Sequence, residues 1–191
     1  DILTFEKIRR SDKLVKLLQA LAWQIGSQVS YNELAQTCSM DAKTVEHYIT
    51  ILEQAFIIFR LGSFSRNLRN ELKSSRKIYF WDNGIRNAII ANFSPIENRN
   101  DAGALWENYL VSERLKKNSY NEAFANFWFW RTKEQQEIDY IEESNGKLNA
   151  FEFKWSDLAA KKAHFPLTFT RAYPNANYKV ISPENVEDFL L

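Results

Sequence analysis

The segment spanning residues 131–155 constrains the fold of this chain more than any other. Two stretches rich in β-branched and aromatic side chains flank Asn145-Gly146, and an Asn-Gly pair in this position is a strong local signal for a β-hairpin. Because side chains on a strand alternate between faces, Glu152 and Lys154 should share one face of the second strand. The opposite face should carry three aromatic residues, Phe151, Phe153 and Trp155.

A second carboxylate, Asp139, lies in the first strand of this hairpin, within Glu137-Ile138-Asp139-Tyr140-Ile141. Charged groups among large aromatic residues are costly unless they pair with one another or hold a metal ion. Two carboxylates and a lysine that converge across a hairpin therefore indicate a divalent-cation site that acts on phosphodiesters. The alternative is an ion network without metal, in which Asp139 neutralises Lys154 and Glu152 accepts from Arg131.

Length and composition limit the class of protein. The 191 residues are enough for one large core or two small domains, and 45% hydrophobic residues indicate a globular protein. With a net charge of +1, nucleic-acid binding would need a local basic patch. The single cysteine, Cys38, excludes an internal disulfide and fits a reducing, cytoplasmic location. We find no apolar run long enough for a membrane helix and expect no membrane partner.

The first half of the chain has the pattern of a winged helix-turn-helix domain, which we expect over residues 1–92. Apolar spacing, a capping box at Ser30-x-x-Glu33 and an N-cap at Asp41 predict three successive helices. Two short apolar runs after the third helix predict the strands of the wing. The predicted helices cover residues 11–25, 31–37 and 42–54, the strands cover 55–61 and 75–81, and a further short helix covers 85–91.

The loop between these two strands is basic. Over residues 62–77, five cations against one acid, Glu71, leave a local charge of +4. Cationic side chains along a phosphate backbone release counterions, so this stretch is predicted to contact DNA. The third helix has a mixed-charge exposed face, which is unfavourable for base reading and leaves protein docking as the alternative. The predicted nucleic-acid-binding residues are Arg66, Arg69, Lys73, Arg76 and Lys77.

The second half follows the order α-β-β-β-α-β, and the fold class is therefore α/β (α+β). A linker is predicted over 93–100, which contains Ser94-Pro95, and a second domain over 101–191. We interpret Phe127-Trp128-Phe129-Trp130 as a central strand buried on both faces, in preference to a surface that stacks nucleobases. The predicted elements are a helix at 102–117, strands at 126–131 and within 136–155, a helix interrupted near Pro166, a strand at 177–182 and a closing helix at 184–191.

A third carboxylate, Glu107, is expected on the first helix of this second domain. Its neighbours three and four positions away are small or apolar, which favours a side chain turned toward the sheet. The alternative is an ion pair with Arg114 on the rim of the helix. The two histidines, His47 and His164, have no other ligand type at metal-binding spacing, and we expect neither to be functional.

Taken together, these residues resemble the PD-(D/E)XK nuclease superfamily: Glu107 on a helix, Asp139 on a strand and, after twelve intervening residues, Glu152-Phe153-Lys154. Ile138 occupies the position of the proline in the superfamily motif. The resemblance implies a restriction-endonuclease-like αβββαβ domain with catalytic Glu107, Asp139, Glu152 and Lys154. It also implies Mg²⁺ or Mn²⁺ held by the three carboxylates, with Lys154 orienting water or stabilising charge on the phosphate.

The combination with an upstream winged helix resembles the C-terminal region of a prokaryotic family of AAA+ P-loop ATPases. No G-x-x-x-x-G-K-[ST] loop is present, so we expect no ATP site in this chain and an ATPase module upstream of it. The expected function is a nucleic-acid-associated, metal-dependent nuclease. The alternatives are a non-catalytic DNA- or protein-binding platform for the ATPase and a transcriptional regulator. The motifs that resemble the family cover residues 77–84, 103–108, 130–131, 137–140 and 151–154.

Overall fold

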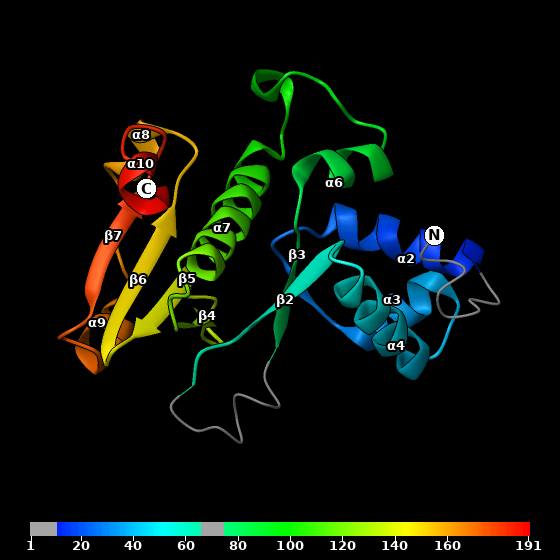
Figure 1. Ribbon diagram of the computed structural model, residues 1–191, viewed down its shortest axis with the longest axis horizontal. Helices are drawn as coiled ribbons and strands as arrows, with labels where there is room; N and C mark the ends of the chain where they lie inside the picture. Colours follow the sequence, from blue (N-terminus) through cyan, green and yellow to red (C-terminus); the bar gives the residue numbers. More distant parts are fainter. Residues whose placement is uncertain (1–10, 66–74) are drawn as a thin grey trace. The chain divides into compact units, whose positions relative to one another are not determined.

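The computed structural model describes residues 11–65 and 75–191 of this mixed helix-and-sheet protein, and it divides the chain into two compact units (Figure 1). Of the described residues, 11–60 and 75–95 form the first unit, and 61–65 and 96–191 form the second. Each unit has its own sheet. Residues 61–65 therefore pack in the second unit, although the chain returns to the first unit after them.

The first unit contains helices and a three-stranded sheet in the order β1-β3-β2. Its helix caps follow the sequence signals: the Ser30 side chain accepts from Glu33 N–H, and Asp41 accepts from Thr44 N–H at 2.9 Å. The predicted apolar stripe of the third helix is buried, with Val45 among its members. The elements are α2 (Ser11–Trp23), β1 (Gln28–Val29), α3 (Tyr31–Cys38), α4 (Ala42–Gln54), β2 (Ile58–Gly62), β3 (Arg76–Phe80) and α6 (Asn83–Ile89).

The second unit contains a four-stranded sheet in the order β4-β5-β6-β7, with α7 running beside β5 and β6 (Figure 1). The β4–β5 and β5–β6 pairs are antiparallel, and β6–β7 is parallel. The order of elements along the chain is the predicted one. They are η1 (Ile96–Asn98), α7 (Ala102–Tyr120), β4 (Asn126–Arg131), β5 (Glu137–Ser144), β6 (Lys147–Phe153), α8 (Asp157–Ala160), α9 (Leu167–Ala172), β7 (Asn177–Ile181) and α10 (Val186–Leu190).

The hairpin between β5 and β6 is confirmed. Ser144 pairs with Lys147, which leaves Asn145 and Gly146 as the two turn residues. Both have positive φ, 50° and 73°, as a type I′ turn requires. The twist of this turn matches that of the flanking strands, so the local sequence sets the register that aligns the charged residues of the two strands.

The prediction that the aromatic strand is central was wrong, because β4 lies at an edge of the sheet. Phe129 is fully buried, but Phe127 is 37% exposed. Residues 61–65 contact the outer edge of β4 at one point, where the Phe64 N–H donates to Phe129 O at 2.6 Å. The Phe64 ring then packs against Trp128 and becomes part of a core on one face of the sheet.

The second unit buries apolar side chains on both faces of its sheet. One cluster contains Ile138, Ile141, Leu148, Ala150, Phe64 and Phe169. On the other face, Tyr140, Phe151 and Phe153 pack around Phe189 of α10. Their ring centroids lie 4.8–6.2 Å from the centroid of the Phe189 ring. Within the described ranges, no helix combines the length and apolar character needed to cross a membrane.

Candidate functional site

A β-bulge places Asp139. Trp128 pairs with Ile141 and Trp130 with Ile138, so two residues of β5 lie opposite the one residue between them on β4. Such a bulge re-aims side chains and is frequent beside functional sites. The regular β5–β6 ladder stops at Tyr140, and beyond it the Asp139 carboxylate accepts from the Phe153 N–H at 2.8 Å. The carboxylate is therefore fixed against the end of β6.

Glu152 and Lys154, at the end of β6, form an ion pair with 2.5 Å between Oε1 and Nζ. Their side chains are 17% and 32% exposed, which leaves the pair half-buried. Burial raises the pKa of Glu152, and the charges of Glu107 and Glu137 raise it further against the lowering effect of Lys154. The net shift is upward. This carboxylate consequently holds its proton more tightly than an ordinary glutamate.

Lys154 is surrounded by acidic groups. Burial lowers the pKa of its ammonium, but the hydrogen bond to Glu152 and the negative charges of Glu152, Asp139 and Glu107 outweigh burial, and the pKa is raised. The ammonium is therefore fully charged near neutral pH. It lies within electrostatic range of all three predicted carboxylates, and this is the observation that brings the four predicted residues together.

Glu107 lies in the first turns of α7. The preceding residue, Trp106, packs edge-on against Trp155, with 5.4 Å between ring centroids. This contact joins the start of α7 to the end of β6. The alternative pairing of Glu107 with Arg114 is not the arrangement found, because the Arg114 guanidinium binds Glu142 and Phe189 O.

The alternative ion network differs in its ion pairs: Lys154 pairs with Glu152, and Arg131 pairs with Glu137 at 3.2 Å. The charge of Asp139 also acts on Lys154, as that alternative expects. Glu137 was not predicted as a site residue, yet its charge acts on Glu152. Its position two residues before Asp139 on the same strand is the signal that indicates this proximity.

Asp139 and Glu152 are the residues here that could hold a magnesium-type ion. Mg²⁺ is commonly bound through one or two carboxylates, with water and substrate phosphate completing its shell. Asp139 and Glu152 supply two such groups. Among residues 11–65 and 75–191, no three or more His, Cys, Asp or Glu side chains come together as a group that could hold a metal ion.

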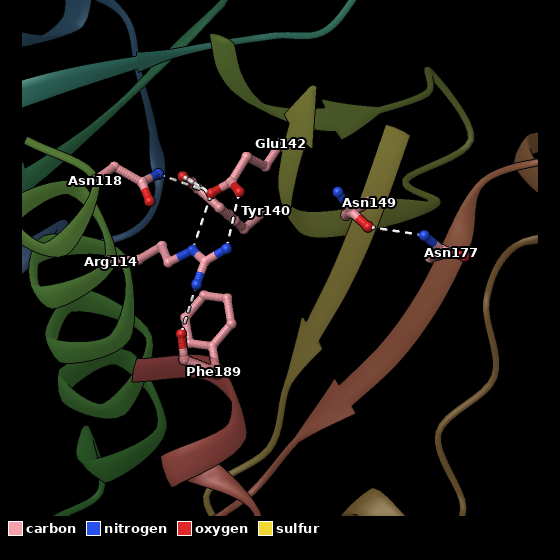
Figure 2. A network of polar contacts seen from close by, with 7 residues as sticks. All are labelled: Arg114, Asn118, Tyr140, Glu142, Asn149, Asn177 and Phe189. Carbon is pink, nitrogen blue, oxygen red and sulfur yellow. Dashed lines mark hydrogen bonds and ion pairs between the residues drawn. The ribbon is translucent and has the colours of Figure 1, made fainter. Parts of the chain in front are cut away.

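A second charged cluster in the same unit was missed by the sequence analysis (Figure 2). Arg114 on α7 donates from Nε and Nη2 to the two oxygens of Glu142, at 2.9 and 2.8 Å. Asn118 and Tyr140 also donate to Glu142, at 2.9 and 3.2 Å. The third Arg114 donor reaches Phe189 O at 2.7 Å, and the guanidinium lies 5.0 Å from the Phe189 ring centroid. The network joins α7, β5 and α10.

The pKa of Glu142 is shifted in the opposite direction from that of Glu152. Burial raises the pKa of Glu142, but the hydrogen bonds from Arg114, Asn118 and Tyr140 and the Arg114 charge outweigh burial, and the net pKa is lowered. The carboxylate is 4% exposed and fully ionised near neutral pH. The available sequence signal was its position two residues after the buried Tyr140, on the same face of β5.

The predicted nucleic-acid-binding residues fall into two groups. Arg66, Arg69 and Lys73 lie outside the described residues. Arg76 and Lys77 lie on β3, where Arg76 is half-buried. Lys77 is only 1% exposed, which corrects its prediction as a phosphate contact. Alternation along a strand turns one of two neighbouring residues inward, and here the inward residue is Lys77.

Comparison with known proteins places this α/β chain among sequences without an assigned activity. A family described as a domain of unknown function (DUF8612) matches residues 1–96, and the chain belongs to that family. A second domain of unknown function (DUF4143) matches residues 102–188. The two matches meet between residues 96 and 102.

Two mycobacterial proteins are similar in sequence. Uncharacterized protein Rv2008c of Mycobacterium tuberculosis and uncharacterized protein Mb2031c of Mycobacterium bovis are each 26% identical to this chain over 136 residues. The match covers 70% of this chain and 30% of each relative. The crystal structure of protein VC1899 from Vibrio cholerae covers 95% of this chain and 50% of its own, at 12% identity and a TM-score of 0.29, too low to indicate a shared fold.

Proposed function

We propose that the second unit is a divalent-cation-dependent phosphodiesterase that acts on nucleic acid, with Glu107, Asp139, Glu152 and Lys154 at its centre. The observation that carries this proposal is the placement of the Asp139 carboxylate, bound by the Phe153 N–H, next to the Glu152–Lys154 ion pair at the end of β6. The order of elements also supports a PD-(D/E)XK-like domain.

Each residue has a distinct proposed role. Asp139 and Glu152 would hold Mg²⁺ or Mn²⁺, with Glu107 contributing directly or through water. The ion would supply a hydroxide-like water and neutralise charge on the phosphate. Lys154 is charged and half-buried, and its ammonium orients the attacking water or stabilises the developing negative charge. The hydrogen bond from Phe153 N–H holds the Asp139 carboxylate in one orientation.

The proposal extends to the full-length protein. The chain spans 30% of the length of the two mycobacterial relatives. We propose that an AAA+ ATPase module precedes it in the full-length, cytoplasmic protein, as the motif resemblance implies. The first unit would be a winged helix-turn-helix that presents the phosphodiesterase to DNA or to a protein partner. Its three helices, short three-stranded sheet and capped turns support this assignment.

A second function is favoured by one observation. Lys154 directly neutralises Glu152 at 2.5 Å, which provides an internal partner for the carboxylate without metal. A non-catalytic DNA- or protein-binding platform of the ATPase would have this arrangement. The two functions differ in their response to Mn²⁺ and in the fate of a phosphodiester substrate.

The test is a plasmid-nicking assay with Mn²⁺ on the wild type and on Asp139→Asn and Glu152→Gln. Both substitutions keep side-chain volume and remove the charge, and we expect nicking to fall by at least about 100-fold in each. Glu113→Gln is the matched control, because Glu113 is a carboxylate of the same unit that pairs with Lys116 on α7. Nicking that is equal in all four proteins would contradict the proposal.

A further inference from the structure

Three aromatic rings form a row beside the candidate site. Trp106 stacks on Tyr109, with ring centroids 5.9 Å apart, and meets Trp155 edge-on at 5.4 Å. The central ring, Trp106, is 9% exposed, while Tyr109 and Trp155 are 41% and 40% exposed. The row therefore has a buried centre and two accessible ends. Leu158 of α8, three residues after Trp155, adds an apolar side chain that is 68% exposed.

Two members of the row are adjacent in sequence to predicted site residues. Trp155 follows Lys154, and Trp106 precedes Glu107. The ring contact between Trp106 and Trp155 holds these two segments of the chain together.

The segment of chain that follows Trp155 carries two lysines. Lys161 and Lys162 are both exposed and follow α8 directly. An apolar protein partner gains little from solvated ammonium groups, whereas a nucleic acid strand uses cations for its phosphates and exposed rings for its bases. Stacking on aromatic faces needs unpaired bases, because paired bases already stack on their neighbours.

A buried polar atom also lies in the row. The indole N–H of Trp106 has no hydrogen-bond partner among the described residues, although its side chain is more than nine-tenths buried. A buried donor without an acceptor costs free energy. The nitrogen is enclosed by protein, so Trp106 is the fixed centre of the row, and bases would be received at its two exposed ends.

We propose that Tyr109, Trp106 and Trp155 form a stacking platform for unpaired bases, and that the substrate of the neighbouring site is single-stranded nucleic acid. This inference rests on the proposed phosphodiesterase and specifies its substrate class. The exposed ring at each end receives a base, and Lys161 and Lys162 contact the backbone. The strand then passes its phosphodiester across Glu152 and Lys154.

The experiment measures binding of a labelled oligothymidylate of about 12 nucleotides by fluorescence anisotropy, a length within the range of single-strand sites. The titration is made in Ca²⁺, which carboxylates also bind through oxygen, and a gel checks that the probe stays intact. The competitor is the same strand annealed to its complement. We expect the wild type to bind the single strand at least about tenfold more tightly than the duplex.

The variants are Tyr109→Ala and Trp155→Ala. Each should weaken single-strand binding by about five- to 100-fold, as loss of one stacked base predicts, and leave duplex binding unchanged. Phe124→Ala is the control, because Phe124 is 93% exposed in the same unit but lies between α7 and β4. Equal binding of both probes, or unchanged binding by Trp155→Ala, would overturn the platform.

The two proposals fail separately. Selective single-strand binding that depends on Trp155, together with an intact substrate in Mn²⁺ at every concentration, would leave the platform standing and remove the phosphodiesterase. Cleavage lost in Glu152→Gln but unchanged in Trp155→Ala on every probe would support the phosphodiesterase and remove the platform.

Discussion

The two charged clusters of the second unit use the same residue types for different purposes. In the Glu142 cluster, the carboxylate accepts from Arg114, Asn118 and Tyr140, and its pKa is lowered. In the Glu152 cluster, the carboxylate has Lys154 as its cationic partner and other carboxylates nearby, and its pKa is raised. The fold stabilises the ionised form of the first carboxylate and disfavours that of the second.

The two glutamates differ in the charges around them. Both clusters join α7 to β5 or β6, and both include a buried or half-buried glutamate. Burial alone therefore does not distinguish them. The balance of charge around each carboxylate does, because it determines whether the ionised form is stabilised by the fold or needs a further partner.

The largest expected effect is on the Glu142 cluster. Replacing Glu142 with Ala leaves the Arg114 charge buried without its carboxylate, which should lower the free energy of unfolding by about 3–5 kcal/mol. Urea denaturation measures this. The double variant Arg114→Met/Glu142→Leu is the control, and we expect it to recover most of the loss, since apolar side chains can replace a buried pair. A loss below about 1 kcal/mol in Glu142→Ala would contradict the structural role.

A smaller effect on stability, one that depends on Mn²⁺, is expected at the Glu152 cluster. Lys154→Met removes the cation closest to Glu152, and because the ammonium is 32% exposed the cost should be about 1 kcal/mol or less. Mn²⁺ should restore this stability, because the ion replaces the missing positive charge beside the carboxylates. Thermal unfolding with and without Mn²⁺ provides the measurement. An equal response to Mn²⁺ in Lys154→Met and Lys154→Met/Asp139→Asn would contradict metal replacement.

The two glutamates should respond to pH with opposite signs. Since the folded pKa of Glu142 is lowered, its stabilisation is complete above the unfolded pKa and is lost as pH falls through the folded pKa. Since the folded pKa of Glu152 is raised, its ionised form destabilises the fold, and protonation removes that cost as pH falls. The wild type should lose stability on acidification relative to Glu142→Gln and gain it relative to Glu152→Gln. Urea denaturation at several pH values measures both differences, and equal signs would contradict the contrast.

The smallest effect is expected at an exposed polar pair in the same sheet. Asn177 Nδ2 donates to Asn149 Oδ1 at 3.0 Å between β7 and β6 (Figure 2). Solvent competes for both groups, so Asn177→Ala should change the free energy of unfolding by only about 0.5 kcal/mol. The same urea assay measures it. A cost comparable to that of Glu142→Ala would mean that hydrogen bonding alone, and not burial of charge, explains the first prediction.

Local features of the fold could be predicted from the sequence. The range of α4 and the hairpin turn at Asn145-Gly146 follow from capping and turn chemistry within a few residues. Glu107, Asp139 and Glu152 were predicted as site residues because their residue types and spacing resemble a known motif, and their role stays a prediction. The contacts that determine α4 and the hairpin turn lie within a few residues of one another.

Features set by distant contacts could not be predicted. Glu142 and its partner Arg114 are 28 residues apart, and only the packing of α7 on the sheet makes them a pair. The edge position of β4 depends on the strand order, which residues 126–131 do not encode. The inward orientation of Lys77 has the same origin. A one-residue bulge decides where Asp139 points, and alternation of side chains cannot show it.

The most direct test of the central claim is calorimetric titration of Mn²⁺ into the wild type, Asp139→Ala and Glu142→Gln. If the Glu152 cluster is the cation site and the Glu142 cluster is structural, Mn²⁺ should bind the wild type and folded Glu142→Gln alike and should not bind Asp139→Ala. Binding that survives in Asp139→Ala, or no binding to the wild type, would contradict the account.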